Sequence, residues 1–598
     1  MGIKTNKLLS NINFEVLTYK YDLFVVSTSD AYFKGGASVL DVSLLENNIQ
    51  AVLFERGKSF YVMMLADSSN KVKLKNALQK CDEKTTVSFS QIKWETVDEP
   101  VILQLLINGL GSVENEILRF NNLTGHLYCF HPEWIRRGRQ GATDCIWKVP
   151  CLEVKISKEN MLSLSVRTFT SVSLKKKISF TKKRFEDYPQ YVFSDRNTLR
   201  RKLKIDTEPA FILRQTDNAK TEIPFLDIQN LSKFRQSKMG VLHNLLQEFN
   251  QKYSGLCSVE LASFVEEDCI DHKRKDDRVQ AEAIRRYLQT QNIRIVDMIN
   301  DDYSEACCKS MEEMLNVQYG ISSTVGKRPN KNALNIALIH NAEYYIDNED
   351  PYNAYGEYVI QHITLEDFHW DSKFAMDSVI HELIIKQDIQ GGRISLFDWK
   401  AGGFSKLSFG LKECIDDIDR YFFMDINPDG TFSFSEQELD LFNLNDYYRC
   451  VSAFEDAKTN GDNVIGLIRL ENGNMNLIKD TDWITIPEID TIYGELQSGN
   501  NKLRGKESRS NFLAASIDIK SFRIPDRKGV FYFVGDIGEG MRYTVQRAAN
   551  IRNVVSYDNS SEMFIDLLPL MDVGFVRNGQ LTVMPFPFKY LREYVRTI

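Results

Sequence analysis

One stretch in the N-terminal half of the chain combines basic and aromatic side chains. Between residues 175 and 204 the basic residues are Lys175, Lys176, Lys177, Lys182, Lys183, Arg184, Arg196, Arg200, Arg201, Lys202 and Lys204, interspersed with Phe180, Phe185, Tyr188, Tyr191 and Phe193. Cations at this density can follow a phosphate backbone, and aromatic rings can stack on bases. The alternative interpretation is a solvated strand edge or linker that binds nothing.

Carboxylates in or beside predicted strands offer a second kind of chemistry. Asp398 lies in segment 393–399, Asp425 lies in segment 421–426, and Asp536 follows segment 531–534. A nuclease or another multidomain α/β enzyme could use such carboxylates to hold Mg²⁺, and a two-metal centre needs about four converging ligands. The sequence around Asp425, with Asp429 and Gly430, is equally typical of a hairpin turn.

Metal and nucleotide motifs of the common kinds are missing from the sequence. The three clustered histidines, His362, His369 and His381, do not have the spacing of a zinc site. The 10 cysteines include no CxxC pair, which argues against a disulfide scaffold and for a reducing compartment. No GxSxG motif, Walker A motif or GxGxxG after a strand occurs.

Composition is that of an ordinary globular protein. Of the 598 residues, 43% are hydrophobic and 26% are charged. The net charge of −8 argues against a protein that simply coats nucleic acid, but it allows a local basic groove. The sequence shows no signal peptide and no apolar run long enough to cross a membrane, so we expect a cytoplasmic protein.

Hydrophobic periodicity predicts a mixed α/β protein. The first 200 residues are mainly strands, with helices predicted near 70–81 and 101–120. From about residue 230, predicted helices alternate with strands, which indicates a parallel sheet covered by helices. The helices are predicted at 237–254, 277–291, 304–320 and 378–389, and the strands at 257–267, 293–299, 333–341 and 358–368. Strands are predicted again at 393–399, 404–411, 421–426 and 430–434, and a helix at 541–555.

Segment 358–392 carries the most informative pattern. A predicted strand contains Gln361, and the next predicted helix contains Glu382, Leu383, Lys386 and Asp388 before the pair Gly391–Gly392. This pattern resembles the junction of the MID and PIWI domains in Argonaute proteins. The resemblance implies that Gln361 and Lys386 hold the 5′-phosphate of a guide strand. A terminal phosphate carries close to two negative charges and favours a cation and amide donors.

Two further residues of this pocket follow from the resemblance. Tyr344 or Tyr345 would stack on the first base of the guide, and we assign Tyr345 to the pocket. The lysine that usually follows is absent, because acidic residues stand there, and Lys327, Arg328 or Lys331 would have to replace it. The carboxylate of Ile598 would hold Mg²⁺ or Mn²⁺ against the guide phosphate, as some members of the family do.

The C-terminal region also resembles this family. Arg577, a β-branched run, the Pro585-Phe586-Pro587 motif and an aromatic last segment follow its closing pattern, and segment 531–555 resembles the PIWI strand–Asp–Gly–helix unit. In the last helix the apolar residues should pack inward. Lys589, Arg592 and Arg596 should lie on the remaining face, where they could meet phosphates.

The catalytic carboxylates of the family are incomplete. Asp425 resembles the first ligand, Asp536 the third and Asp572 the last. The spacing between Asp536 and Asp572 is too short for the family's intervening elements, and no glutamate between 425 and 536 clearly matches the family's catalytic glutamate. We therefore expect no intact catalytic centre.

The resemblance covers roughly residues 230–598 and implies a Rossmann-like MID domain at 231–390 and an RNase H-like PIWI domain at 391–598. The part before it matches the family only in being β-rich. There we expect a β-rich N-terminal domain at 1–110 and a linker and β region at 111–230, with the PAZ domain absent or reduced.

The implied function is guide-directed recognition of nucleic acid. A short 5′-phosphorylated guide, DNA rather than RNA, would pair with target DNA of plasmids or other invaders, and a separate helicase/nuclease effector would act on the target. In this respect the chain resembles the catalytically inactive, DdmE-type plasmid-defence Argonautes of bacteria. The alternatives are an Mg²⁺-dependent nuclease of RNase H-like fold that cuts the target itself, and a structural defence subunit without nucleic acid.

Overall fold

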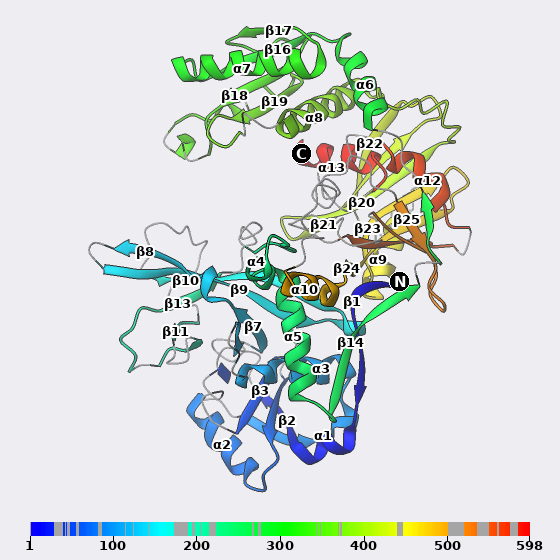
Figure 1. The fold of residues 1–598 in the computed structure, drawn as a ribbon. Helices are drawn as coiled ribbons and strands as arrows, with labels where there is room; N and C mark the ends of the chain where they lie inside the picture. The colour runs from blue at the N-terminus through cyan, green and yellow to red at the C-terminus, as the bar shows by residue number, and fades with distance from the viewer. Residues whose placement is uncertain are drawn as a thin grey trace. The chain divides into compact units, whose positions relative to one another are not determined.

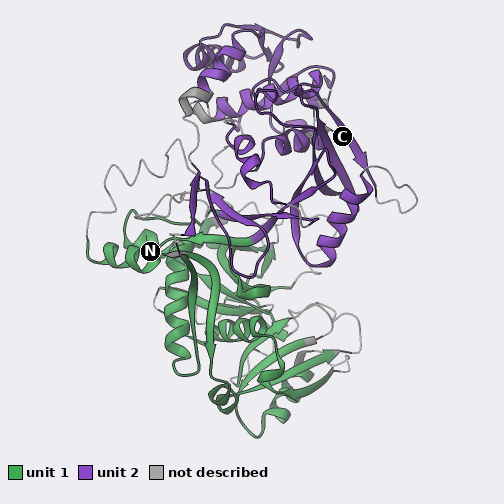
Figure 2. Ribbon diagram, turned by 90° about the vertical axis from the view of Figure 1, so that its right-hand side faces the viewer, with its two compact units in different colours: residues 1–267, 482–513, 537–549 green, residues 268–481, 514–536, 550–598 purple. Residues whose placement is uncertain are grey.

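The computed structural model divides the chain into two compact units (Figure 2). Unit 1 comprises residues 1–267, 482–513 and 537–549, and unit 2 comprises residues 268–481, 514–536 and 550–598. The structure describes all residues except 1, 29–39, 42–43, 45–47, 55–58, 82–86, 114, 116, 124, 141–142, 173–188, 194–197, 204, 215–222, 266–267, 273–276, 343, 347, 354, 369, 371–372, 439–446, 500–518, 535–548, 559–560, 574–583 and 598. Among the described residues, no helix is long and apolar enough to cross a membrane.

The first sheet of unit 1 lies between two helices. Its strands β2 (Tyr21–Thr28), β3 (Ile49–Phe54), β4 (Ser59–Leu65) and β5 (Val87–Ile92) are antiparallel, in the order β3-β4-β2-β5. Alternation along β2 turns Phe24 and Val26 towards α2 (Asn70–Cys81), whereas Leu23 joins the core that contains α3 (Glu99–Gly109). Helix α1 (Phe14–Lys20) precedes this sheet. The predicted helix at 70–81 is confirmed.

A second antiparallel sheet follows α3. Its order is β12-β11-β13-β10-β9-β7-β6, and β8 pairs with β9. The strands are β6 (Arg119–Leu123), β7 (His126–Phe130), β8 (Arg136–Gln140), β9 (Thr143–Ile156), β10 (Leu162–Ser171), β11 (Tyr191–Phe193), β12 (Leu199–Arg201) and β13 (Phe211–Arg214).

The prediction of a single helix over 101–120 was wrong in its second half. Helix α3 ends at Gly109, and the chain enters β6 at Arg119. The Nζ of Lys252 donates to the Gly109 carbonyl at 2.6 Å and satisfies an acceptor at the helix end. A Cβ at Gly111 would lie 2.8 Å from the backbone nitrogen of Asn122, so the chain passes β6 too closely there for any larger residue.

Residues 231–267 belong to unit 1, although the sequence placed them at the start of the MID-like domain. Helices α4 (Leu231–Arg235) and α5 (Lys238–Lys252) share the core of α3 and α10 (Ile489–Gln497). Strand β14 (Cys257–Val265) forms where predicted, but it pairs antiparallel with β1 (Gly2–Ile12) instead of joining the parallel sheet. The four-domain division stays a prediction.

Unit 2 contains the parallel sheet that the helix–strand alternation predicts. Strands β16 (Ile293–Asp297), β17 (Ser323–Gly326), β18 (Leu334–Ile339) and β19 (Ile360–Thr364) are parallel, in the order β17-β16-β18-β19. Figure 1 shows α6 (Asp277–Leu288), α7 (Asp302–Tyr319) and α8 (Lys373–Gly391) with this sheet. Helix α7 begins at a capping box of Asp301 and Ser304 and ends at Gly320, whose φ of 67° suits glycine.

The second sheet of unit 2 is larger. Its order is β15-β25-β26-β27-β24-β23-β20-β21-β22, and the pairs of β20, β21, β22 and β23 are antiparallel. The strands are β15 (Ile270–His272), β20 (Leu407–Ile415), β21 (Ile418–Ile426), β22 (Phe432–Gln437), β23 (Asn463–Leu470), β24 (Met475–Ile486), β25 (Ile519–Phe522), β26 (Val530–Val534) and β27 (Asn550–Ser556). Helices α12 (Phe564–Met571) and α13 (Pro587–Thr597) share one core with this sheet, and α9 (Tyr448–Thr459) packs in another.

Two elements in this part differ from the sequence prediction. Segment 393–399 makes only an isolated bridge, between Arg393 and Thr431, and its apolar residues enter the core from irregular backbone. Residues 550–556 form strand β27, where the sequence predicted the end of a helix. Their burial on both sheet faces removes the alternation that would have indicated a strand.

Candidate functional site

The site that the sequence singled out lies between β19 and α8 in unit 2. Side chains alternate along a strand, so Gln361 shares the face of β19 on which Ile363 packs against α8. Its neighbour Ile360 belongs to a cluster on the opposite face of the sheet. Lys386 stands in the second half of the 19-residue helix α8. The fold thus brings together two residues that are 25 positions apart.

Lys386 is bonded directly to the strand. Its Nζ donates to Oε1 of Gln361 at 2.9 Å and to the carbonyl oxygen of Ile360 at 2.9 Å. An ammonium group has three donors, so one remains for another acceptor. Because the Gln361 carbonyl faces the cation, its amide nitrogen turns away; it donates one long hydrogen bond, of 3.5 Å, to the His362 carbonyl, which leaves its second N–H for a further ligand.

Charged residues of α13 surround this pair. The Oε1 of Glu593 lies 3.8 Å from the Lys386 Nζ, and the two side chains are 12% and 22% exposed. Burial lowers the pKa of Lys386, while the Glu593 and Glu382 carboxylates raise it in part. Burial also lowers the pKa of Lys589, and the nearby positive charge of Arg596 adds to this effect. The surroundings of Lys386 therefore hold both cations and carboxylates.

The predicted stacking residue Tyr345 lies elsewhere. Its hydroxyl accepts a hydrogen bond from the backbone N–H of His340 at 3.1 Å, just beyond the end of β18. Gln361 pairs in register with Ile336, four residues before His340. At about 3.3 Å per residue, these points are roughly 13 Å apart along the sheet. The structure does not bring Tyr345 to the Gln361–Lys386 pair.

A buried polar contact fixes α13 against α8. Asp388, two residues after Lys386, is 3% exposed. Its Oδ2 accepts from the Tyr590 hydroxyl at 2.6 Å and from the Ser395 N–H at 3.0 Å. Burial raises the pKa of Asp388 to about 6, because these hydrogen bonds only partly offset the loss of water around the charge. This contact holds Lys589, Glu593 and Arg596 in position beside Lys386.

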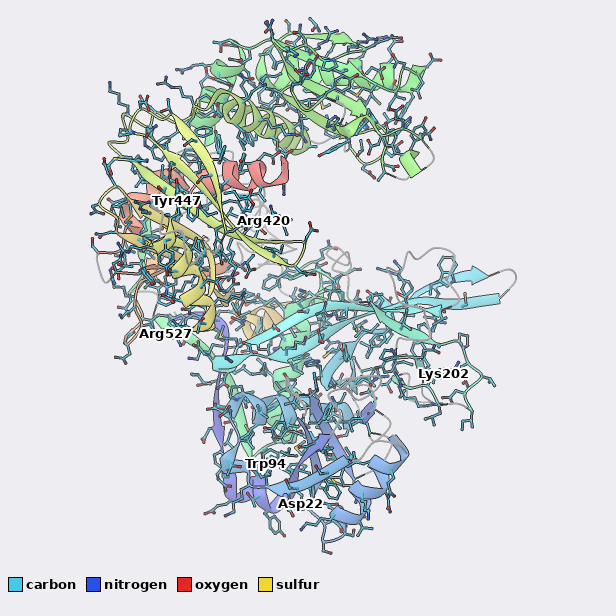
Figure 3. The ribbon with its side chains drawn as sticks, turned by 180° about the vertical axis from the view of Figure 1, so that it is seen from behind. Asp22, Trp94, Lys202, Arg420, Tyr447 and Arg527 are labelled. Carbon is cyan, nitrogen blue, oxygen red and sulfur yellow. The ribbon has the colours of Figure 1, made fainter. Side chains whose placement is uncertain are left out.

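The predicted catalytic carboxylate Asp425 is engaged by neighbouring side chains. It lies inside β21, so it is part of the strand and not of the hairpin turn. Its Oδ2 accepts from the Tyr447 hydroxyl at 2.5 Å and lies 3.8 Å from the Lys406 Nζ (Tyr447 is labelled in Figure 3). Its buried Oδ1 has no partner among the described residues.

Among the described residues, the other acidic candidates do not form a set of metal ligands with Asp425. Asp398 lies in a turn instead of a strand, where its Oδ1 accepts from the Ala401 N–H at 2.9 Å. Asp572 follows the last residue of α12 as its C-cap. Asp536 is outside the described residues. Within the described part of the chain, no three His, Cys, Asp or Glu side chains are placed to hold a metal ion.

The basic stretch 175–204 is described only in part. Eight of its basic residues lie outside the described residues: Lys175, Lys176, Lys177, Lys182, Lys183, Arg184, Arg196 and Lys204. Within the described part, Arg200 is bonded to both carboxylate oxygens of Asp206, at 2.6 and 2.7 Å. The Lys202 Nζ donates to the Glu208 carbonyl at 3.1 Å (Figure 3). These two residues are therefore less available to phosphates than the sequence suggests.

The C-terminal helix forms as predicted. Tyr590 and Leu591 are buried, and Tyr594 and Val595 pack against the same core. Burial lowers the pKa of Arg592, and the nearby Glu413 carboxylate opposes the effect. Because Glu413 belongs to β20, Arg592 lies beside the larger sheet. Arg577 and Ile598 lie outside the described residues.

A divalent ion at the guide phosphate, which the resemblance implies, receives no support from the described side chains. The carboxylates beside Lys386 are those of Glu382 and Glu593, and both stand among cations. Divalent ions favour several convergent oxygen ligands. These side chains do not fit such an ion by themselves.

Sequence reasoning missed Glu593 and Tyr590 as parts of this site. Tyr590 and Asp388 are 202 positions apart, and no local pattern links them. The only signal was the placement of Glu593 between basic residues on a helix with an apolar stripe. A comparison of the chain with models of protein families found no match, and neither did a comparison with curated proteins.

Proposed function

We propose that the chain is a guide-directed, nucleic-acid-binding protein of the Argonaute kind that anchors the 5′-phosphate of its guide at Gln361 and Lys386. The parallel sheet with α6, α7 and α8 would serve as the MID-like part, and the larger sheet with α13 as the PIWI-like part. The guide would be DNA rather than RNA, and the target would be invading DNA. A separate helicase or nuclease would complete the defence.

One observation carries this proposal: Lys386 and Gln361 form a direct 2.9 Å bond beside the charged face of α13. A lysine ammonium and a glutamine amide held in this way supply a cation and N–H donors to a single point. A terminal phosphate has three acceptor oxygens and a charge between −1 and −2 near pH 7. Once such a 5′ end is held, base pairing reads the target sequence while the protein contacts the backbone.

The first experiment asks whether a guide is present. Protein purified without added nucleic acid should give a raised ratio of absorbance at 260 nm to that at 280 nm. Extracted strands should be short, uniform in length and 5′-phosphorylated, so that they accept an end label only after phosphatase treatment. Purified protein that carries no such strands and binds none when they are added would contradict the proposal.

Glu593 should weaken phosphate binding, because its carboxylate lies 3.8 Å from the Lys386 Nζ and repels an incoming anion. Replacing it, as Glu593→Gln, frees Lys386 and removes one negative charge at nearly constant volume. Affinity for a 5′-phosphorylated strand should rise by about twofold to fivefold, since a partly exposed charge interaction is worth roughly 0.5–1 kcal/mol. Fluorescence anisotropy with labelled strands measures this change, and a loss of affinity would contradict the expectation.

The protein alone should not cut its target. The carboxylate of Asp425 is bonded to Tyr447 and lies near Lys406, an arrangement unlike an open metal site. A labelled single-stranded target, incubated with guide, protein and either Mg²⁺ or Mn²⁺, should stay intact on a denaturing gel. A specific product that disappears in Asp425→Ala would favour the alternative function, a nuclease that cuts the target itself.

A further inference from the structure

A two-stranded ribbon extends from the second sheet of unit 1. Strand β8 pairs only with β9, and the first residues of β9, before Lys148, pair only with β8 among the described strands. Figures 1 and 3 show these two strands reaching beyond the rest of their sheet. At about 3.4 Å per residue, the five residues of β8 make an arm roughly 17 Å long.

An indole ring stiffens this ribbon. Trp147 is an extra residue of β9 at a bulge, where the register shifts between Arg136 and Arg137. Its ring lies against Gly138 so closely that a Cβ there would be 2.6 Å from it. The Trp147 Nε1 also donates to the Cys145 Sγ at 2.8 Å. The packing of the ring on Gly138 ties the two strands together, and the bond to Cys145 holds the ring in place within β9.

The ribbon is strongly basic in a chain whose net charge is −8. Residues 136–148 contain four basic residues and one acidic residue. Arg136, Arg137 and Lys148 are exposed, and no carboxylate of the described residues forms an ion pair with any of them. In this they differ from Arg200 of the same sheet, which Asp206 neutralises.

We propose that the β8–β9 ribbon is a second nucleic-acid-binding site, which contacts the phosphates of a double strand through Arg136, Arg137 and Lys148. A two-stranded ribbon fits the major groove of a duplex, which is about 12 Å wide. Arginine is suited to phosphate because its planar guanidinium presents several donors. This site is separate from the Gln361–Lys386 pair and needs no free 5′ end.

The experiment uses the full-length protein and a 20-base-pair DNA duplex with 5′-hydroxyl ends. The variant Arg136→Gln/Arg137→Gln/Lys148→Gln removes three exposed charges. Binding is measured by anisotropy between 50 and 300 mM KCl. The slope of log K against log salt should become shallower by up to about 2.7, at about 0.9 for each lost phosphate contact. The charge-preserving variant Arg136→Lys/Arg137→Lys should keep most of the slope.

The matched control removes the same charge from another exposed region of unit 1, as Lys71→Gln/Lys75→Gln/Lys93→Gln. Its slope should equal that of the unaltered protein. An equal decrease in both triple variants would show a general effect of net charge and overturn the proposal, as would absence of duplex binding in the unaltered protein. The ribbon variant should also retain its preference for 5′-phosphorylated over 5′-hydroxyl single strands. Loss of duplex binding at the ribbon can therefore be distinguished from loss of phosphate binding at the Gln361–Lys386 pair.

Discussion

A 5′-phosphorylated guide should bind the double variant Gln361→Ala/Lys386→Ala at least about 100-fold more weakly than it binds the unaltered protein. Each of these side chains would give a hydrogen bond to a charged group, worth about 1.5–3 kcal/mol. A difference of 1.4 kcal/mol is tenfold in affinity, so two lost bonds amount to about two orders of magnitude or more. Equilibrium binding of labelled single strands measures the effect directly.

The loss should be specific to the phosphate. Lys386 also holds the Gln361 carbonyl at 2.9 Å, so either single substitution should remove part of the contribution of the other residue. The same strand with a 5′-hydroxyl should bind the variant and the unaltered protein with nearly equal affinity. A variant that binds both strands as the unaltered protein does would place the pocket elsewhere.

An exposed lysine on another helix of unit 2 provides the control. Lys309 lies on α7 and is paired with Glu305 at 2.9 Å. Lys309→Ala removes the same charge from a helix and should leave the preference for a 5′-phosphate unchanged. An equal loss in Lys309→Ala would mean that overall charge, not the Gln361–Lys386 pair, determines guide affinity.

The sequence could predict the elements that carry the site but not all of their contacts. Strands β16, β18 and β19 and helices α6, α7 and α8 were predictable because their apolar residues repeat at the strand and helix periods. Gly392, in the double glycine after α8, has a φ of 64°, a conformation that glycine adopts without strain. Gln361 and Lys386 could then be placed on adjacent elements of one α/β unit.

Contacts between distant segments were beyond the sequence. Nothing in the order of residues indicates that Tyr590 reaches Asp388, or that Glu593 reaches Lys386. The position of Tyr345 was also beyond the sequence, because the loop after β18 turns its hydroxyl back to the His340 backbone. The strand predicted at 393–399 failed because buried apolar residues in irregular backbone alternate like those of a strand.

Removing one hydroxyl from the contact between α8 and α13 should destabilise unit 2 most at alkaline pH. Asp388 has a pKa of about 6, above the ordinary value near 4 because the carboxyl is buried. The folded state therefore binds the proton more tightly than the unfolded state does. The stability that this group contributes is fully present below about pH 4 and is lost as pH rises through about 6, by up to about 3 kcal/mol for two pKa units.

Above pH 6 the buried carboxylate depends on its donors, the Tyr590 hydroxyl at 2.6 Å and the Ser395 N–H at 3.0 Å. In Tyr590→Phe one donor is lost while the charge stays buried, which should cost about 2–3 kcal/mol at pH 8. At pH 4.5 the carboxyl is largely protonated, and the same change should cost about 1 kcal/mol. The pKa of Asp388 should also rise further in this variant, because a bond that favours its charged form is gone.

Urea unfolding of the full chain at pH 4.5 and pH 8 measures how much unfolding free energy Tyr590→Phe loses at each pH. Tyr352→Phe is the control, because that tyrosine is 56% exposed. Water reaches this residue at either pH, so loss of its hydroxyl should change the stability little. Asp388→Asn should flatten the pH dependence, since it removes the group that titrates. An equal loss of stability in Tyr590→Phe at the two pH values would show that Asp388 does not carry a buried charge, and that the bond to Tyr590 joins two neutral groups throughout.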